Sequence, residues 1–179
     1  MTDRKAAGSS WSMADVSEKP ATRRVAVASG TIIVGDRAFS MLEKGELPKG
    51  DPLAMAEIAG VMAAKQTPRL IPLCHPISLS RASVHSVLRP ELSGVEVFCM
   101  AEITERTGVE MEALTGLQVA LLTIWDLVKP VNPELELSGT RLLYKSGGKK
   151  GTWRHPEFDE NALPGEVRVR ITSTEADGS

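Results

Sequence analysis

The chain has 179 residues, 42% hydrophobic and 25% charged, which is typical of a soluble one-domain globular protein and excludes a disordered or fibrous chain. A formal net charge of -2 and only 4% aromatic residues disfavour a nucleic-acid-binding protein. Cys74 and Cys99 form no metal-ligand spacing, and no apolar run of about 18 residues is present. We therefore expect a cytoplasmic protein with reduced cysteines, no zinc module and no contact with a membrane.

The first predicted elements occupy the N-terminal part of the chain. Residues 1–12 are small and polar, a composition typical of a disordered terminus. Residues 24–34 combine β-branched and small side chains with partial alternation, which predicts a strand. A short amphipathic segment at 36–43, before Gly45, is a candidate helix.

A longer helix is predicted from Asp51, as its N-cap, through Pro52 at the first helical position to about Gln66. Small residues recur along this helix and would let another element approach closely, which is a packing role. Its apolar stripe is expected to consist of Met55, Ile58, Ala59 and Met62.

Three further strands and a second long helix complete the predicted core. The strands are expected at 83–88, 94–104 and 135–144, the last interrupted by a bulge or turn at Ser138 and Gly139. The helix covers roughly 112–128 and ends before Pro130, with leucines recurring at helical spacing toward the sheet. Strands that alternate irregularly with helices predict an α+β sandwich, with about four strands in one sheet and helices packed on one face.

Asp126 and Lys129 lie three residues apart near the end of the second long helix, so they share a face and can touch. That face lies opposite the core-facing stripe and also carries Val119 and Leu122, which favours a cleft or a subunit contact over open solvent. In a cleft the pair would hold a carboxylate beside an ammonium group, an arrangement suited to acid-base steps. An ordinary exposed ion pair explains the same spacing and is favoured by the spacing alone.

Segment 67–80 has a proline at every fourth residue, at 68, 72 and 76, which predicts a stiff, extended loop. Cys74 and His75 are adjacent in it. Neighbouring residues on an extended chain point to opposite sides, so these two make a poor nucleophile-base pair. For Cys74 we favour a small core residue, whereas His75 is equally consistent with a structural histidine and with a binding group.

Charged residues mark further candidate sites. KSGGKKG, residues 145–151, follows a predicted strand and could cradle phosphate, although it is not a P-loop and a solvated basic loop is the more frequent explanation. Lys49 precedes a helix N-terminus, where free N–H groups favour anions. Glu110 and Glu112 approach the second long helix, where capping alone would explain them. Together these groups indicate a small phosphorylated substrate but do not name the reaction.

Long motifs in this order resemble the MoaC-type family, the cyclic pyranopterin monophosphate synthases. The matching blocks are ADVSEKPATRRVAVASG, KGDPLAMAEIAGVMAAKQTPRLIPLCHPISLS, TGVEMEALTGLQVALLTIWDLVK and RLLYKSGGKKG, which together span about residues 13–153. The motifs LIPLCHP and TGVEMEALT are long and unusual in composition, so chance similarity is a poor explanation.

The resemblance implies a ferredoxin-like subunit with an antiparallel sheet, assembled as a homohexamer built from dimers, with active sites at subunit interfaces. It also implies a pyrophosphate-releasing lyase of molybdenum cofactor biosynthesis. We expect no cofactor and no metal-ligating residues, and the sequence leaves open whether a divalent ion assists the departure of pyrophosphate. The substrate would be (8S)-3',8-cyclo-7,8-dihydroguanosine 5'-triphosphate, and the product cyclic pyranopterin monophosphate. The alternative is a noncatalytic nucleotide-binding scaffold of the same fold, which would have no need of the acid-base pair Asp126 and Lys129.

The resemblance also implies the site residues, motif by motif. Four residues are expected to be catalytic: Asp126 and Lys129 as acid-base groups, and Lys49 and Lys145 as ligands of phosphate or the transition state. Substrate contacts are expected from Leu73, Cys74, His75, Met111 and Glu112, with Glu110 supporting the same pocket. Weaker candidates, from the side of a neighbouring subunit, are Lys149, Arg24 and Arg106.

The chain departs from the family pattern at two places. Ala14 stands where the family usually has a larger aliphatic residue, a change expected to be harmless because Asp15 and Ser17 remain. The family-like domain is expected to cover residues 13–154, with 155–179 as a C-terminal extension of unknown role. Within it, GEVRVRIT, residues 165–172, alternates like an added strand.

Overall fold

One antiparallel sheet organises the computed structural model, which describes residues 11–176, and its strand order is β2-β3-β1-β4-β5. The strands are β1 (Thr22–Ile33), β2 (Arg81–Arg89), β3 (Gly94–Glu105), β4 (Glu136–Ser146) and the two-residue β5 (Trp153–Arg154). The four predicted strands are confirmed, and β5 adds a short edge. β1 lies at the centre, paired along its length with β3 and β4, so the sheet is held together by contacts distant in sequence.

The predicted irregularity in β4 is a bulge. Ser29 pairs with Arg141 and Thr31 with Ser138, so two residues of β4 stand opposite Gly30 alone. Gly139 has φ +62, a left-handed conformation that favours glycine. The bulge therefore lies where Ser138 and Gly139 indicated it.

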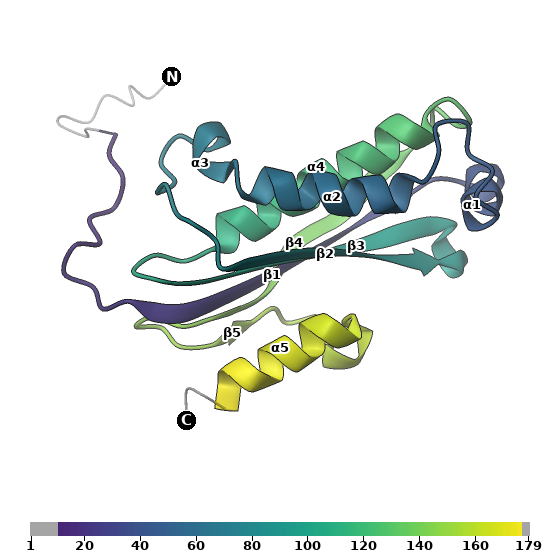
Figure 1. Ribbon diagram of the computed structural model, residues 1–179. Coiled ribbons are helices and arrows are strands. Elements are labelled where there is room, and N and C mark those ends of the chain that lie inside the picture. The colour runs from purple at the N-terminus through teal and green to yellow at the C-terminus, as the bar shows by residue number, and fades with distance from the viewer. Residues whose placement is uncertain (1–10, 177–179) are drawn as a thin grey trace, which may run out of the picture.

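Helices α2 (Pro52–Ala64) and α4 (Glu110–Val128) cover one face of the sheet, as predicted (Figure 1). Asp51 caps α2 by accepting hydrogen bonds from the backbone N–H groups of Leu53 at 2.9 Å and Ala54 at 3.1 Å. The candidate helix at 36–43 is also present as α1 (Asp36–Glu43). The fold is an α+β, ferredoxin-like sandwich.

The predicted apolar stripe of α2 was wrong, because α2 buries its small residues instead. Gly60 packs on α4 so closely that a Cβ added to it would lie 2.8 Å from the carbonyl oxygen of Gly116. The side that packs consists of Pro52, Ala56, Gly60, Ala63 and Ala64. Met55, Ile58 and Met62 are consequently more than half exposed, and α2 presents an apolar surface to solvent.

The loop expected over 67–80 begins with one helical turn, α3 (Thr67–Leu70), and is irregular only afterwards. Pro68 lies at the start of that turn, a position where proline is compatible with a helix. The prediction of an extended loop was therefore wrong for the first four residues.

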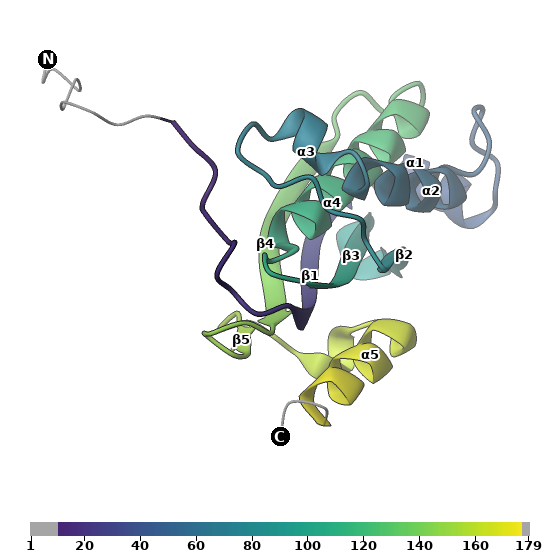
Figure 2. The ribbon, with the colours of Figure 1, turned by 60° about the vertical axis from the view of Figure 1, so that its left-hand side comes forward.

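The C-terminal extension was also predicted incorrectly, since residues 165–172 belong to a helix, α5 (Gly165–Ala176), and not to a strand. Figure 2 shows α5 against the face of the sheet opposite α2 and α4. Val167 and Ile171, one helical turn apart, are buried against the sheet, whereas Val169 is 70% exposed. Two short 3-10 helices, η1 (Pro90–Leu92) and η2 (Glu160–Ala162), complete the elements.

Both faces of β1 are buried as a result. Ala26, Ala28 and Ile32 face a core shared with α2 and α4, whereas Val25 and Val27 face a second core shared with α5. The predicted disorder of residues 1–12 falls mainly on residues 1–10, which lie outside the described part of the chain.

Helix α4 is long and apolar enough, by length and composition, to cross a membrane, which the sequence analysis did not anticipate. It packs against α2 and against the sheet, and ten of its residues, among them Leu117, Leu121 and Ile124, are buried. A core helix passes the same test, so its composition is weak evidence for a membrane span.

Candidate active site

Lys49, Asp126 and Lys129 form one cluster at the C-terminal end of α4. The Asp126 carboxylate accepts a hydrogen bond from Lys129 Nζ at 2.7 Å and another from Lys49 Nζ at 3.0 Å. These hydrogen bonds, with Lys129 contributing most, lower the pKa of Asp126. The predicted pair is therefore a triad, with an ionised carboxylate between two cations.

This triad is open to solvent in the single chain. The Asp126 and Lys129 side chains are 53% and 52% exposed, and the neighbouring Leu122 is 54% exposed. The charged triad and the exposed apolar residues beside it are therefore accessible for contact with another molecule. The end of α4 holds the triad in place because Lys129 is its C-cap and Pro130 prevents further helix.

A second cluster surrounds the N-terminal end of α4 and lines a cavity of about 490 Å³. Lys145, from β4, donates a hydrogen bond to Glu110 Oε1 at 2.9 Å. Burial acts to raise the pKa of Glu110, but the hydrogen bond from Lys145 helps to outweigh it, and the pKa lies below its ordinary value. The cavity thus contains a carboxylate that stays ionised and a lysine that balances it.

The glycine-rich loop after β4 shapes this cavity. Gly147 has φ +92, and a Cβ there would lie 2.2 Å from the carbonyl oxygen of Arg23, so only glycine fits. The Gly148 N–H donates to Thr22 Oγ1 at 3.2 Å, which ties the loop to the start of β1. The basic residues around the cavity are Lys19, Arg24, Lys145, Lys149 and Lys150.

A smaller hollow of about 230 Å³ adjoins the cavity, and both are lined by Gly108 and Glu110. The hollow collects the predicted substrate contacts Leu73, Cys74, His75, Met111 and Glu112. Cys74 is only half-buried here, so the expectation that it is a core residue was wrong. The buried cysteine is Cys99, whose pKa burial raises to about 12.

The pKa values of Glu110 and Glu112, which lie close together on α4, shift in opposite directions. Burial raises the pKa of Glu112, and the negative charge of Glu110 adds to that effect. The pKa of the Cys74 thiol is also raised, first by burial and second by the negative charge of Glu112. A low-pKa and a raised-pKa carboxyl in one hollow is an arrangement that suits acid-base chemistry.

The N-terminal segment lies along both hollows. His75 Nε2 donates to the carbonyl oxygen of Ala14 at 2.9 Å, which leaves Nδ1 of a neutral ring free to accept. Because the contact uses the backbone of Ala14, the small side chain at this position does not remove it. Arg106, which lines neither hollow, donates to the carbonyl oxygen of Ser17 at 2.7 Å and anchors the same segment.

Sequence reasoning missed Lys19 and Lys150 as lining residues. Lys150 belongs to the predicted basic loop, and its neighbour Lys149 was singled out. Lys19 lies in the first matching block, and its basic character was the available signal. Among residues 11–176, no group of three or more His, Cys, Asp or Glu is arranged to hold a metal ion.

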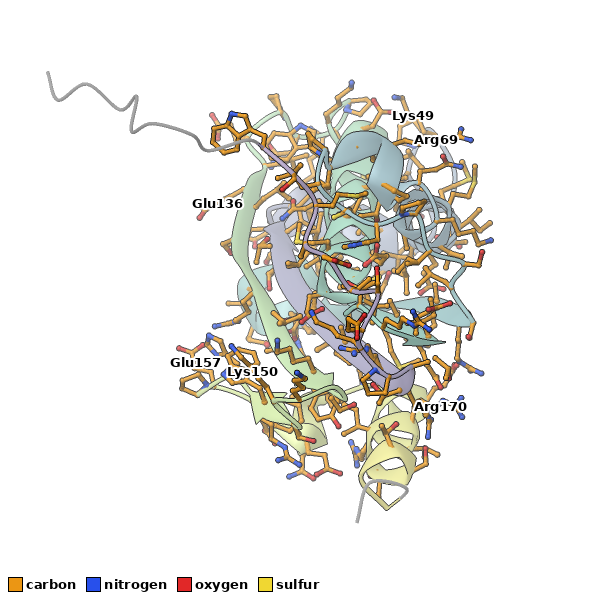
Figure 3. All side chains as sticks on the ribbon, turned by 90° about the vertical axis from the view of Figure 1, so that its left-hand side faces the viewer. Lys49, Arg69, Glu136, Lys150, Glu157 and Arg170 are labelled. Atoms are coloured by element: carbon orange, nitrogen blue, oxygen red, sulfur yellow. The ribbon has the colours of Figure 1, made fainter. Side chains whose placement is uncertain are left out.

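The two clusters are far apart within one chain. Glu110 and Asp126 are sixteen residues apart on a continuous helix, which at 1.5 Å per residue separates them by roughly 24 Å. In Figure 3 the labelled Lys49 lies beside the helices and the labelled Lys150 near the opposite edge of the view, beside the end of β4. One chain does not bring all the predicted site residues together.

Comparisons with known proteins agree with the motifs. A model of the MoaC family matches residues 13–148. Three similar proteins bear the name cyclic pyranopterin monophosphate synthase. That of Cereibacter sphaeroides is 48% identical over 139 residues, covering 78% of this chain and 87% of its own length. That of Thermomicrobium roseum is 45% identical over 148 residues (83% and 89%), and that of Chloroflexus aggregans 43% over 145 residues (81% and 88%). The chain belongs to the MoaC family.

Proposed function

We propose that this chain is a lyase that converts (8S)-3',8-cyclo-7,8-dihydroguanosine 5'-triphosphate into cyclic pyranopterin monophosphate and pyrophosphate, a step of molybdenum cofactor biosynthesis. The observation that carries the proposal is the 48% identity of this chain to a protein named cyclic pyranopterin monophosphate synthase, across most of both chains. The ion-paired triad at Asp126 supports it, because a noncatalytic scaffold would have no need of such acid-base groups.

The basic cavity is proposed to bind the phosphates. Its positive side chains come from three parts of the chain, with Lys19 before β1, Arg24 in β1, and Lys145, Lys149 and Lys150 in or after β4. Lysine and arginine neutralise phosphate oxygens, and the glycine-rich loop lets backbone N–H groups approach them closely. Lys145 would release Glu110 and donate its hydrogen bond to a phosphate oxygen instead. Its positive charge would then stabilise the negative charge that develops as pyrophosphate departs.

The adjoining hollow is proposed to hold the ring system that is rearranged. It offers Leu73 and Met111 as apolar contacts, and His75 and Glu112 as groups that exchange protons. The raised pKa of Glu112 favours its protonated form, which can donate to a ring nitrogen or oxygen. Glu110 lines both this hollow and the basic cavity, which supports the proposal that one elongated substrate occupies the two together.

The triad of Lys49, Asp126 and Lys129 is proposed to reach the same substrate from another copy of the chain. Its separation of roughly 24 Å from Glu110 along α4 is too great for one small molecule to touch both clusters within one chain. A homo-oligomer, a hexamer built from dimers, would bring the triad of one copy to the cavity of the next. The apolar surface of Met55, Ile58 and Met62 on α2, with Leu122 on α4, would supply contact area for such assembly.

The proposal includes the cytoplasm as the location of the protein and residues 13–154 as the catalytic domain. Cys74 and Cys99 are both free thiols, which is compatible with a reducing compartment. The chemistry proposed here uses side chains and backbone N–H groups of the protein, without a cofactor.

Incubation of the purified protein with the cyclised dihydro-GTP tests the proposal. We expect release of pyrophosphate and formation of a product that oxidises to a fluorescent pterin. Lys129→Ala should abolish both signals and leave the oligomer intact, whereas Lys65→Ala, which alters an exposed lysine at the end of α2, should change neither. A folded, oligomeric wild-type protein that yields neither product would overturn the assignment.

A further inference from the structure

The segment before β1 forms a compact turn that ends at Lys19. The Asp15 carboxylate accepts hydrogen bonds from the Ser17 N–H at 2.9 Å and from the Ser17 hydroxyl at 2.7 Å, and the Lys19 N–H donates to the carbonyl oxygen of Val16 at 3.1 Å. The two hydrogen bonds from Ser17 also lower the pKa of Asp15, so this carboxylate stays ionised to lower pH. Residues 15–19 are therefore a preformed unit, in which the position of Ser17 decides the position of Lys19.

Polar contacts hold this turn against the rest of the chain. Its residues are exposed except for the half-buried Val16, and Figure 2 shows the segment as the purple trace that leads into β1 along the outside of the fold. Arg106 Nη1 donates to the carbonyl oxygen of Ser17 at 2.7 Å, and His75 contacts the carbonyl oxygen of Ala14 at 2.9 Å. Because little apolar burial fixes the turn, its position depends on these two side chains.

Arg106 itself is firmly placed, in the connection between β3 and α4. The main-chain carbonyl oxygens of Glu105 and Arg106 accept hydrogen bonds from Arg24 of β1, from Nε at 2.9 Å and from Nη2 at 3.2 Å. The same Arg24 side chain lines the basic cavity, and Gly148 packs so closely on it that an added Cβ would lie 2.6 Å from Nη1. The backbone of Arg106 is thus fixed to the wall of the cavity, while its side chain holds the turn.

The turn brings its last residue to the cavity. Lys19 lines the basic cavity together with Lys145 and Lys149, whereas Arg106 lines neither the cavity nor the adjoining hollow. Lys19 follows by two residues the carbonyl group that Arg106 holds. The guanidinium of Arg106 can therefore influence a ligand of the cavity through the position of Lys19.

We propose that Arg106 is a positioning residue, which holds the Ser17 carbonyl so that the Lys19 ammonium reaches the phosphates, and that it does not itself contact the substrate. A lysine side chain has a flexible four-carbon stem, so its contact with a phosphate depends on where the main chain places the stem. A main chain that is already fixed also lowers the ordering cost of binding. The inference rests on the proposed function, and it differs from the resemblance, which implies Arg106 as a substrate contact from a neighbouring subunit.

A double-mutant cycle on the affinity for inorganic tripolyphosphate tests this role without requiring turnover. Isothermal titration calorimetry on the full chain compares Lys19→Met, Arg106→Met and the variant with both changes. We expect Lys19→Met to weaken binding by about 10- to 100-fold, the loss expected for one hydrogen bond between charged groups, and Arg106→Met to weaken it by a similar or smaller factor. Added to Lys19→Met, Arg106→Met should weaken binding by less than about twofold further, because the residue that it positions is already lost.

Arg37→Met, at an exposed arginine of α1, is the matched control and should leave the affinity unchanged with or without Lys19→Met. Two results overturn the inference. The first is an Arg106→Met variant that binds tripolyphosphate as the wild type does. The second is a double variant weakened by the full product of the two single factors, as expected if Arg106 contacts phosphate directly or only stabilises the fold.

Turnover of the cyclised dihydro-GTP distinguishes this failure from a failure of the proposed function. A wild-type protein that releases pyrophosphate, with variants that give the full product of the two factors, keeps the reaction and loses the positioning role. A wild-type protein that does not bind tripolyphosphate overturns the phosphate-binding cavity and this inference together.

Discussion

Lys49 donates hydrogen bonds to two oxygens of Asp126, the main-chain carbonyl at 2.9 Å and carboxylate Oδ2 at 3.0 Å. The first bond satisfies a carbonyl at the C-terminal end of α4, where four such groups lack helical partners. The second neutralises a carboxylate that the helix dipole disfavours at this end. Lys49 thus joins the α1–α2 connection to the end of α4 and fixes the position of the Asp126 carboxylate.

Lys49→Met keeps the apolar stem of the side chain and removes its charge. We expect kcat/KM to fall by about 10²- to 10⁴-fold, since the variant loses a cation that orients the carboxylate proposed as the acid-base group. Lys65→Met, at an exposed lysine, is the matched control. Steady-state kinetics on both variants give the comparison, and an unchanged kcat/KM in Lys49→Met would remove the triad from the mechanism.

Mixed oligomers test whether two copies complete one site. Asp126→Ala and Lys145→Ala chains should each be inactive alone, because each lacks one of the two separated clusters. Co-expression should restore up to about a quarter of wild-type activity, the fraction of sites that receive both intact clusters when copies assemble at random. Mass spectrometry confirms the mixing of the chains. Confirmed mixing without any recovery would mean that each chain completes its own site.

Glu112 gives the reaction a predicted pH dependence. Its pKa is raised above 4.5, chiefly by burial, so its proton is retained to higher pH than that of an ordinary glutamate. We expect kcat/KM to fall as the pH rises through this raised pKa, because the protonated form is the proposed donor. Glu112→Gln, which cannot ionise, should lose this part of the pH profile. The hypothesis fails if the variant keeps an identical profile.

Gly116→Ala tests the close approach of α2 and α4. A Cβ there would lie 2.7 Å from Cys99 Sγ and 2.9 Å from the carbonyl oxygen of Gly60, so the helices must shift. We expect the free energy of unfolding to fall by about 1–3 kcal/mol, the usual effect of overpacking a core. Gly165→Ala, where nothing lies within 4 Å, is the control and should change it by about 0.5 kcal/mol or less. Urea denaturation measures both, and equal effects would contradict the prediction.

The strands and the ends of α2 and α4 were predictable because local chemistry sets them. Asp51 and Pro52 begin α2 through an N-cap and a fixed φ, and Pro130 follows the end of α4. The buried side of α2 was not predictable from hydrophobicity. The backbones of α2 and α4 meet at Gly60 and Gly116, where only small residues fit. The larger Met55, Ile58 and Met62 therefore lie on the exposed side of α2.

The residues of α5 fit two periodicities, which explains the wrong prediction. Val167, Val169 and Ile171 alternate as in a strand, but Leu163, Val167 and Ile171 also recur at every fourth residue, as in a helix that buries one side. A helix forms because it buries Val167 and Ile171 on the open apolar face of the sheet and leaves Val169 exposed. That selection depends on tertiary structure, which the pattern alone does not contain.

The candidate site residues were identified from motifs, but which of them lie together could be seen only from the fold. Lys145 and Glu110 are thirty-five residues apart in sequence, and they meet only because β4 pairs with β1 beside the start of α4. Conversely, Asp126 and Glu110 share a helix and lie at its two ends. Sequence proximity therefore predicted the triad partner Lys129 correctly. It gave no indication of which remaining residues lie with the triad and which line the cavity.

The nineteen-residue length of α4 has a consequence for the completeness of any assembly. Under the proposed function each chain donates its triad to one reaction centre and its cavity to another. In a closed arrangement every donated half meets its counterpart, and there are as many working centres as chains. An open row of copies would always end in one unmatched triad and one unmatched cavity, so loss of a single subunit would cost more activity than the fraction of protein removed.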